Sequence, residues 1–178
     1  INDTTVDAGE LTTLDGKTTV NVNINSVTTM TGTVAEVAQF FTDKDNFSNT
    51  GNIGTITIDS GAVGDAGALK NLHNNMRTLK TDAVVNATNI TTISGTYAEL
   101  SSLVTYAGAS TITNFSGRNL TEDTATISVA NANTLSGSTT GTVTASLGTI
   151  SLASSAALNE TGHAYTIAIN DTTVDAGE

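Results

Sequence analysis

The ten residues INDTTVDAGE, Ile1–Glu10, occur a second time at Ile169–Glu178, 168 positions further along the chain. Ten consecutive identities do not arise by chance in a chain of 178 residues. We interpret residues 1–168 as one repeat unit of a continuous tandem array and residues 169–178 as the start of the next repeat. The duplicated stretch therefore predicts an architecture in which neighbouring copies of the same repeat pack against one another.

The duplicated stretch also predicts a helix start. Asp7 and Glu10 have the spacing of a helix N-cap and the third helical residue, and apolar residues come after them. Asp65–Ala68 (DAGA) repeats this pattern in front of a longer apolar stripe, which predicts the longest helix over roughly Ala66–Lys80. INDTTVDAGE is thus expected to contain the end of a strand, a turn and the beginning of a helix.

Two further segments align without a gap: VTTMTGTVAEVAQFF at Val27–Phe41 and ITTISGTYAELSSLV at Ile90–Val104. In each, a strand-like run ends at Gly and leads into a capping box, where a Thr and a Glu three residues later satisfy each other's backbone N–H groups. Apolar residues at helical spacing come after both. The predicted capping pairs are Thr33 with Glu36 and Thr96 with Glu99.

Short runs in which β-branched apolar residues alternate with small polar ones recur along the chain, as in Thr55–Ile58 and Thr166–Ile169. Such alternation predicts half-buried strands, with starts near residues 19, 27, 55, 90, 111, 125, 148 and 166. From about Asn119 to Ala168 helical signals are weak, and we expect strands to dominate there.

This order predicts a β-rich fold with short helices, arranged as a parallel α/β solenoid whose coils stack along a fibre axis. Most of the intervals between strands are long enough for a parallel crossover connection. A chain of antiparallel β-sandwiches is the alternative, although it leaves the capped amphipathic helices unexplained.

The charge balance excludes several partners. The formal net charge is -11, from 17 acidic and 6 basic residues, and the basic residues form no continuous stripe. We therefore expect no nucleic-acid partner, because phosphates would be repelled. No stretch approaches the roughly 20 apolar residues of a membrane span, so no membrane insertion is expected. The absence of Cys excludes disulfides and thiolate metal sites.

Calcium is the one cofactor that the sequence suggests. The loop TDKDNFSNTGN carries oxygen ligands of the kind that Ca²⁺ requires, on a flexible Asn- and Gly-containing segment. Its spacing matches neither the EF-hand loop nor the glycine-rich calcium nonapeptide, which favours a solvated turn with helix caps over a calcium site. The candidate calcium ligands are Asp43, Asp45, Asn46 and Asn49, with a second group at Asp3, Asp7 and Glu10.

No residue set predicts catalysis. His73 and His163 are the only histidines, and His73 lies beside the apolar stripe of a predicted helix, where a partly buried structural role is expected. No nucleophile elbow, zinc-binding H-E-x-x-H or phosphate loop is present. The Thr-x-Thr pairs that resemble ice-binding faces recur at irregular intervals, which favours ordinary strand threonines: Thr55/Thr57, Thr111/Thr113, Thr124/Thr126 and Thr142/Thr144. We expect the protein not to be an enzyme.

The combination of Thr-Ile strands, INDTTVDAGELTTLD and ITTISGTYAEL resembles the repeats of giant secreted, adhesin-like or filament-forming surface proteins of marine bacteria and cyanobacteria. The resemblance covers most of Ile1–Val104, and the calcium nonapeptide is missing. It implies an extracellular or cell-surface location and a structural repeat of a fibre, filament or stalk that assembles through neighbouring copies. A glycan-, surface- or calcium-binding module of a giant adhesin, or a phage tail fibre, is the alternative function.

Overall fold

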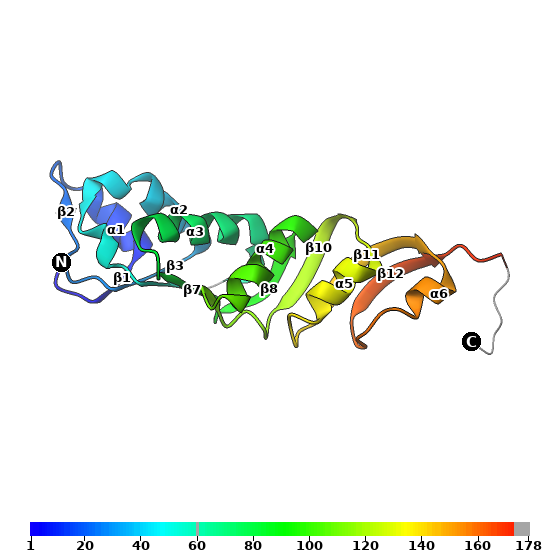
Figure 1. Cartoon of the computed structure of the whole chain (residues 1–178). Coiled ribbons are helices and arrows are strands. Elements are labelled where there is room, and N and C mark those ends of the chain that lie inside the picture. The colour runs from blue at the N-terminus through cyan, green and yellow to red at the C-terminus, as the bar shows by residue number, and fades with distance from the viewer. Residues whose placement is uncertain (60, 173–178) are drawn as a thin grey trace.

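The computed structural model describes residues 1–59 and 61–172, and short parallel strands alternate in it with short helices along one long axis (Figure 1). The strands are β1 (Thr5–Asp7), β2 (Val22–Asn23), β3 (Thr29–Gly32), β4 (Phe47–Ser48), β5 (Thr55–Ile58), β6 (Gly61–Asp65), β7 (Val84–Asn86), β8 (Ile90–Gly95), β9 (Ile112–Thr113), β10 (Asn119–Thr126), β11 (Val143–Ile150) and β12 (Ala164–Ile169). The α-helices are α1 (Ala8–Asp15), α2 (Val34–Thr42), α3 (Ala66–Leu79), α4 (Tyr97–Gly108), α5 (Val129–Ser136) and α6 (Leu152–Ser155), and the 3₁₀ turns are η1 (Lys44–Asn46) and η2 (Thr50–Asn52).

The strands form two larger sheets and one small one. The first sheet has the order β1-β3-β5-β7-β9, the second β12-β11-β10-β8-β6, and β2 pairs with β4. Every strand pair in the part of the chain that the structure describes is parallel. The predicted mixed α/β class with parallel strands is confirmed, and the antiparallel sandwich alternative is wrong.

A row of apolar side chains runs across the first sheet on its inner face. Val6 is in register with Met30, Met30 with Ile56, Ile56 with Val85, and Val85 with Ile112. The last four are buried, and only Val6, on the edge strand β1, is partly exposed. Because side chains alternate across a strand, the residues on either side of this row point outward, which explains the Thr-apolar-Thr pattern of these strands.

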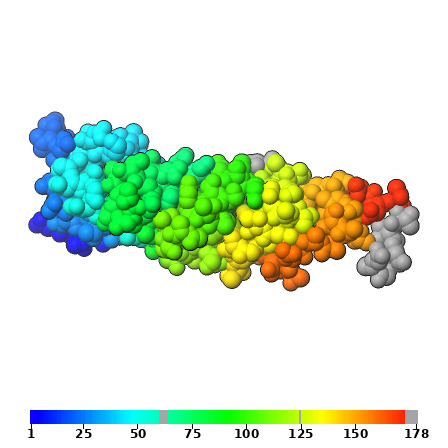
Figure 2. Space-filling model, viewed as in Figure 1, coloured from blue at the N-terminus to red at the C-terminus, as the bar shows by residue number. Residues whose placement is uncertain are grey.

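The helices stack in sequence order. α1 packs on α2, α2 on α3, α3 on α4 and α4 on α5. Figure 2 shows the consequence: the molecule is elongated, and its surface follows the sequence from residue 1 at one end to β12 near the other. We call each segment that runs from one strand of a large sheet, through a helix, to the next strand of that sheet a turn of chain. Each turn of chain therefore contacts the turns that come before and after it in the sequence.

The helix starts follow the capping chemistry predicted from the sequence. Thr33 and Thr96 each accept from the backbone N–H three residues on, and Glu36 and Glu99 accept from the backbone N–H of Thr33 and Thr96 in return. These backbone hydrogen bonds, and after them those from the two threonine hydroxyls, lower the pKa of both glutamates. The predicted long helix is also confirmed, because α3 occupies Ala66–Leu79.

Strands dominate the segment after Asn119, as predicted, with β10, β11 and β12, but two short helices that the sequence does not indicate lie between them. α5 and α6 each begin at a serine, Ser128 or Ser151, whose side chain accepts from a backbone N–H three residues on. α5 has a short apolar face, on which Ala132 and Leu135 are buried, and α6 has only four residues, so periodicity does not reveal either helix.

Candidate functional site

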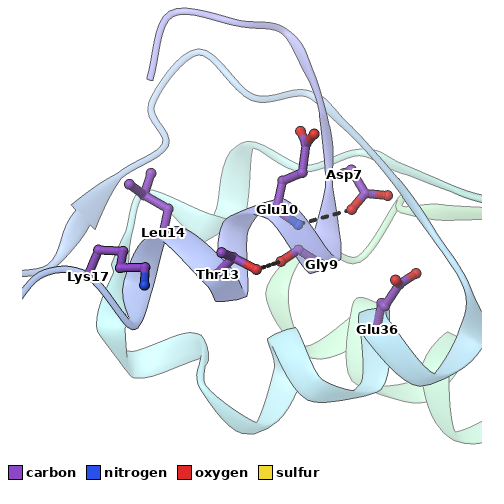
Figure 3. Close-up of a pocket in the computed structure, with 7 residues that line it drawn as sticks. All are labelled: Asp7, Gly9, Glu10, Thr13, Leu14, Lys17 and Glu36. Atoms are coloured by element: carbon purple, nitrogen blue, oxygen red, sulfur yellow. Dashed lines mark hydrogen bonds between the residues drawn. The ribbon is translucent and has the colours of Figure 1, made fainter.

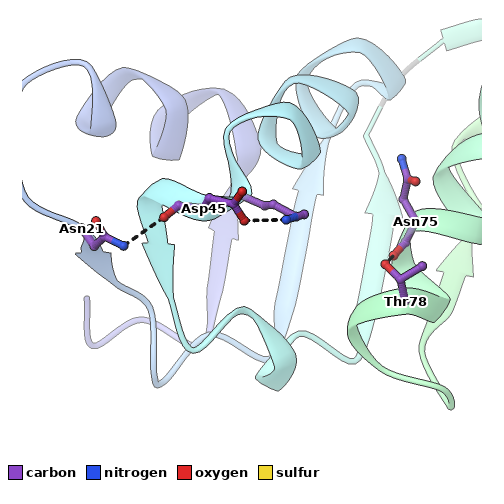
Figure 4. A network of polar contacts seen from close by, with 5 residues as sticks. Asn21, Asp45, Asn75 and Thr78 are labelled. Atoms are coloured by element: carbon purple, nitrogen blue, oxygen red, sulfur yellow. Dashed lines mark hydrogen bonds and ion pairs between the residues drawn. The ribbon is translucent and has the colours of Figure 1, made fainter.

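The four predicted calcium ligands lie around η1 and β4, and each has an oxygen or nitrogen already engaged. Asp43 accepts from the Gln39 amide at 2.8 Å, and the carboxylate of Asp45 pairs with Lys44. Figure 4 shows Asn21 donating to the backbone oxygen of Asp45, at 3.0 Å. These contacts engage both carboxylates and connect the loop to the segment around Asn21.

Asn46 and Asn49 point their amides at the preceding turn of chain. Asn46 Nδ2 donates to Asp15 at 2.9 Å, and Asn49 Nδ2 donates to the side-chain oxygen of Asn23 at 2.9 Å. Asn49 itself has φ = 67°, a left-handed conformation that Asn tolerates well. Within residues 1–59 and 61–172, no group of three or more His, Asp or Glu side chains is placed to hold a metal ion. The calcium assignment stays a prediction.

The second acidic group surrounds the start of α1. A depression of about 570 Å³ lies here, and Figure 3 shows the residues that line it: Asp7, Gly9, Glu10, Thr13, Leu14, Lys17 and Glu36. Asp7 caps α1 by accepting from the backbone N–H of Glu10 at 3.0 Å, and Thr13 donates to the Gly9 carbonyl at 2.8 Å. Glu36 is held by the backbone and side chain of Thr33. Asp7 and Glu36 therefore serve as helix caps.

The structure brings the two kinds of capping motif together, a contact that was not predicted from the sequence. A Cβ added at Gly9 would lie 3.0 Å from Glu36 Oε1, and a Cβ added at Gly67 would lie 2.6 Å from Glu99 Oε1. In both places an Asp-Ala-Gly helix start therefore packs directly against the Gly-Thr-x-x-Glu helix start of the next turn. We call this arrangement the cap pair. The feature of the sequence that could have predicted the cap pair is that both motifs occur twice, in the same order.

Asparagine pairs between successive turns were not predicted either. Asn25 accepts from Asn52 through its backbone oxygen at 2.7 Å, and Asn86 accepts from Asn114 at 2.9 Å. A third such pair is Asn23 with Asn49. In all three pairs the two partners are 26 to 28 residues apart in the sequence, which is about one turn of chain. The feature of the sequence that could have predicted these pairs is the recurrence of Asn at that interval.

The threonines are more regular than their intervals indicated. Thr29 and Thr31 of β3 are in register with Thr55 and Thr57 of β5, as members of two outward-facing rows. Thr124, Thr126 and Thr144 belong to strands of the other large sheet, and Thr142 directly precedes β11. Intervals between pairs in different sheets carry no information about register.

His73 joins two turns. Its Nε2 lies 2.8 Å from the hydroxyl oxygen of Thr111, and its ring stacks on Tyr106 with centroids 3.8 Å apart. The Thr111 hydroxyl donates to the Tyr106 carbonyl at 3.1 Å, so it accepts from the histidine. His73 is only 5% exposed, which fits the predicted structural role. In this arrangement the histidine does not take a proton from the hydroxyl.

This contact predicts a pH dependence. Burial, and after it the nearby charge of Arg77, lower the pKa of His73 from its ordinary value of 6.5, against the opposing effect of the Asn74 hydrogen bond. The unfolded chain therefore binds a proton more readily, so the stabilisation is complete above pH 6.5 and is lost as the pH falls through the lowered pKa. Urea unfolding between pH 7.5 and 5 should show this loss, and His73→Gln should flatten it. An unchanged profile in His73→Gln would contradict this role.

No helix among the described residues is long and apolar enough to cross a membrane. Comparison of the chain with protein-family models, with curated proteins and with solved structures finds no match.

Proposed function

We propose that this chain is one repeat unit of an extracellular or cell-surface fibre, in which 168-residue units stack without linkers as a continuous parallel α/β solenoid. The observation that carries the proposal is the register between successive turns. Thr5 is paired with Thr29, Thr29 with Thr55, and Thr55 with Val84, always in parallel. Each turn of chain thus sets the position of the next one through strand pairing, as in solenoids, where each repeat contacts only its neighbours.

The two ends support the same proposal. β1 and β12 are the terminal strands of their sheets, and each therefore presents an edge whose backbone groups can pair with another strand. The identical decapeptides at the two ends of the sequence indicate that each unit is succeeded by another unit of the same kind. Neighbouring copies are the partners that this organisation requires.

The chemistry of the surface suits a passive, solvated rod. The outward-facing rows of the first sheet consist mainly of threonines, and the net charge of -11 favours solubility and disfavours lateral collapse onto other acidic chains. The resemblance to secreted tandem-repeat surface proteins is the reason for proposing an extracellular location. No catalytic role is part of the proposal.

Imaging of the native material tests the proposal. Negative-stain electron microscopy should show long, unbranched, stiff filaments of constant width with a regular axial repeat. Separate beads joined by flexible connections would contradict a continuous solenoid.

A binding module of an adhesin is the second candidate. The observation that favours it is the cluster of asparagine side chains on the turns around β2 and β4, next to the predicted calcium ligands: Asn21, Asn23, Asn25, Asn49 and Asn52. Amide groups in such numbers suit glycan hydroxyls or, with Asp43 and Asp45, a calcium ion. Thermal melts with calcium and with chelator should then differ, and Asp45→Ala should remove the difference. Identical melts would eliminate the calcium site.

A further inference from the structure

Two equivalent leucines have opposite environments. α1 and α3 begin with the same pattern, in which Leu11 and Leu69 occupy one position and Leu14 and Leu72 the next turn. Leu11 and Leu69 are both 2% exposed. Leu72 is also 2% exposed, whereas Leu14 is 43% exposed.

The neighbours of the two helices explain the difference. α3 lies between α2 and α4 and packs on both. α1 is the first helix of the row and packs on α2 (Figure 1). Leu14 therefore occupies a position that a preceding turn of chain would bury.

The surface around Leu14 is an apolar end face. A depression of about 220 Å³ is lined by the side chains of Ile1, Val6, Leu11 and Leu14, with Asp3, Asp7 and Glu10 at the same site. Val20, nearby in the sequence, is 71% exposed. At the other end of the molecule Ile169, on the terminal strand β12, is 42% exposed. The large apolar side chains exposed in the described part of the chain thus belong to its first and last turns.

The second copy of the decapeptide shows which segment its first four residues contact. Residues 169–172 repeat Ile1–Thr4, and they contact the turn before them: Asn170 N donates to the Ile150 carbonyl at 3.1 Å, and Asp171 accepts from Leu152 N at 2.6 Å. The segment that lies against INDT in this chain is therefore the start of α6 and the end of β11.

We propose that the end face formed by Ile1, Val6 and Leu14 is a head-to-tail interface whose partner is residues 150–168 of the preceding copy. The inference rests on the continuous array proposed above and names its junction. α6 of the preceding copy packs on α1 as α2 packs on α3, and it covers Leu14. Asp3 accepts a hydrogen bond from Leu152 N of the preceding copy, as Asp171 does within this chain.

A tandem chain of two copies tests the interface, with its own internal control. Leu14 of the first copy is at the free end of such a chain, and Leu14 of the second copy is at the junction. Leu14→Ser in the second copy should lower the melting temperature by about 4–8 °C, because it removes a buried leucine, whereas the same substitution in the first copy should have little effect. Equal effects at the two positions would overturn the interface.

A labelling experiment gives a second readout that does not depend on stability. The chain contains no cysteine, so Leu14→Cys introduces the only thiol. We expect a thiol reagent to modify this cysteine at least tenfold more slowly in the second copy than in the first, and equal rates would overturn the proposal. X-ray scattering of the same two-copy chain separates failure of the interface from failure of the array. A stiff rod with equal labelling rates contradicts this interface alone, and a chain that bends freely at the junction contradicts the continuous array as well.

Discussion

Phe40→Ala is expected to lower the free energy of unfolding by about 3–5 kcal/mol, the largest effect expected of any single side-chain truncation in this protein. Phe40 is fully buried on α2. Its ring centroid lies 5.0 Å from that of Phe47 on β4 and 5.6 Å from that of Phe41. Truncation would remove the contact between the helix and the return segment of the same turn and would leave a cavity that neighbouring turns cannot fill.

Urea denaturation of the whole chain measures this loss. Val20→Ala is the control, because Val20 is 71% exposed and its truncation should change the free energy of unfolding by less than about 0.5 kcal/mol. A loss below about 1 kcal/mol for Phe40→Ala would mean that the second turn is not packed as described.

Gly95→Ala should lower the free energy of unfolding by about 2–4 kcal/mol, because it adds a methyl group inside the second cap pair, where the start of α3 packs on the start of α4. A Cβ at this position would lie 2.8 Å from Cβ of Ala66 and 3.0 Å from Glu99 Oε2, and Gly95 has φ = 156°, which side chains rarely adopt. The added methyl group would therefore separate the starts of α3 and α4, and would disturb the capping glutamate.

A double-mutant cycle identifies the contact. Ala66→Gly removes the opposing methyl group, so the pair Gly95→Ala with Ala66→Gly should be destabilised by less than the sum of the single variants. Gly117→Ala is the matched control, since a Cβ there meets nothing within 4 Å. Additive effects in the cycle would show that Ala66 and Gly95 do not touch.

The sequence was most informative where one short segment determines the structure by itself. The capping boxes at Thr33 and Thr96 depend on residues three positions apart, and α3 has a long apolar stripe. Both were predicted within a residue or two. The short helices α5 and α6 each begin at a single capping serine, and α5 also packs on α4, and local periodicity does not contain that information.

In the candidate site, too, features within one segment follow from the sequence, whereas contacts between segments do not. The sequence identifies Asp7 and Glu36 as helix-capping residues, but the packing of Gly9 against Glu36 depends on the number of residues between α1 and α2, which sets the stacking of the turns of chain. The register of Thr29 with Thr55 likewise depends on the length of the intervening turn. A sequence read segment by segment predicts helices and strands, whereas contacts between turns of chain depend on how these elements are arranged in three dimensions.

The duplicated decapeptide now has a more specific meaning than a repeat boundary. Its first copy supplies the edge strand β1 and the Asp7 cap of α1. Its second copy lies within the described residues only up to Thr172, and there it extends β12 and contacts the start of α6. The duplication also predicts that Ile169–Glu178 lies one axial repeat from Ile1–Glu10 in nearly the same orientation, and most of this prediction falls on residues 173–178, which the structure does not describe.

Small-angle X-ray scattering of chains with one, two and three copies tests the central claim most directly. A continuous solenoid predicts that the cross-sectional radius of gyration stays constant while the maximum dimension grows by the same increment with each added copy. A maximum dimension that grows by less with each copy, as it does for beads on flexible linkers, would contradict stacking across the repeat boundary.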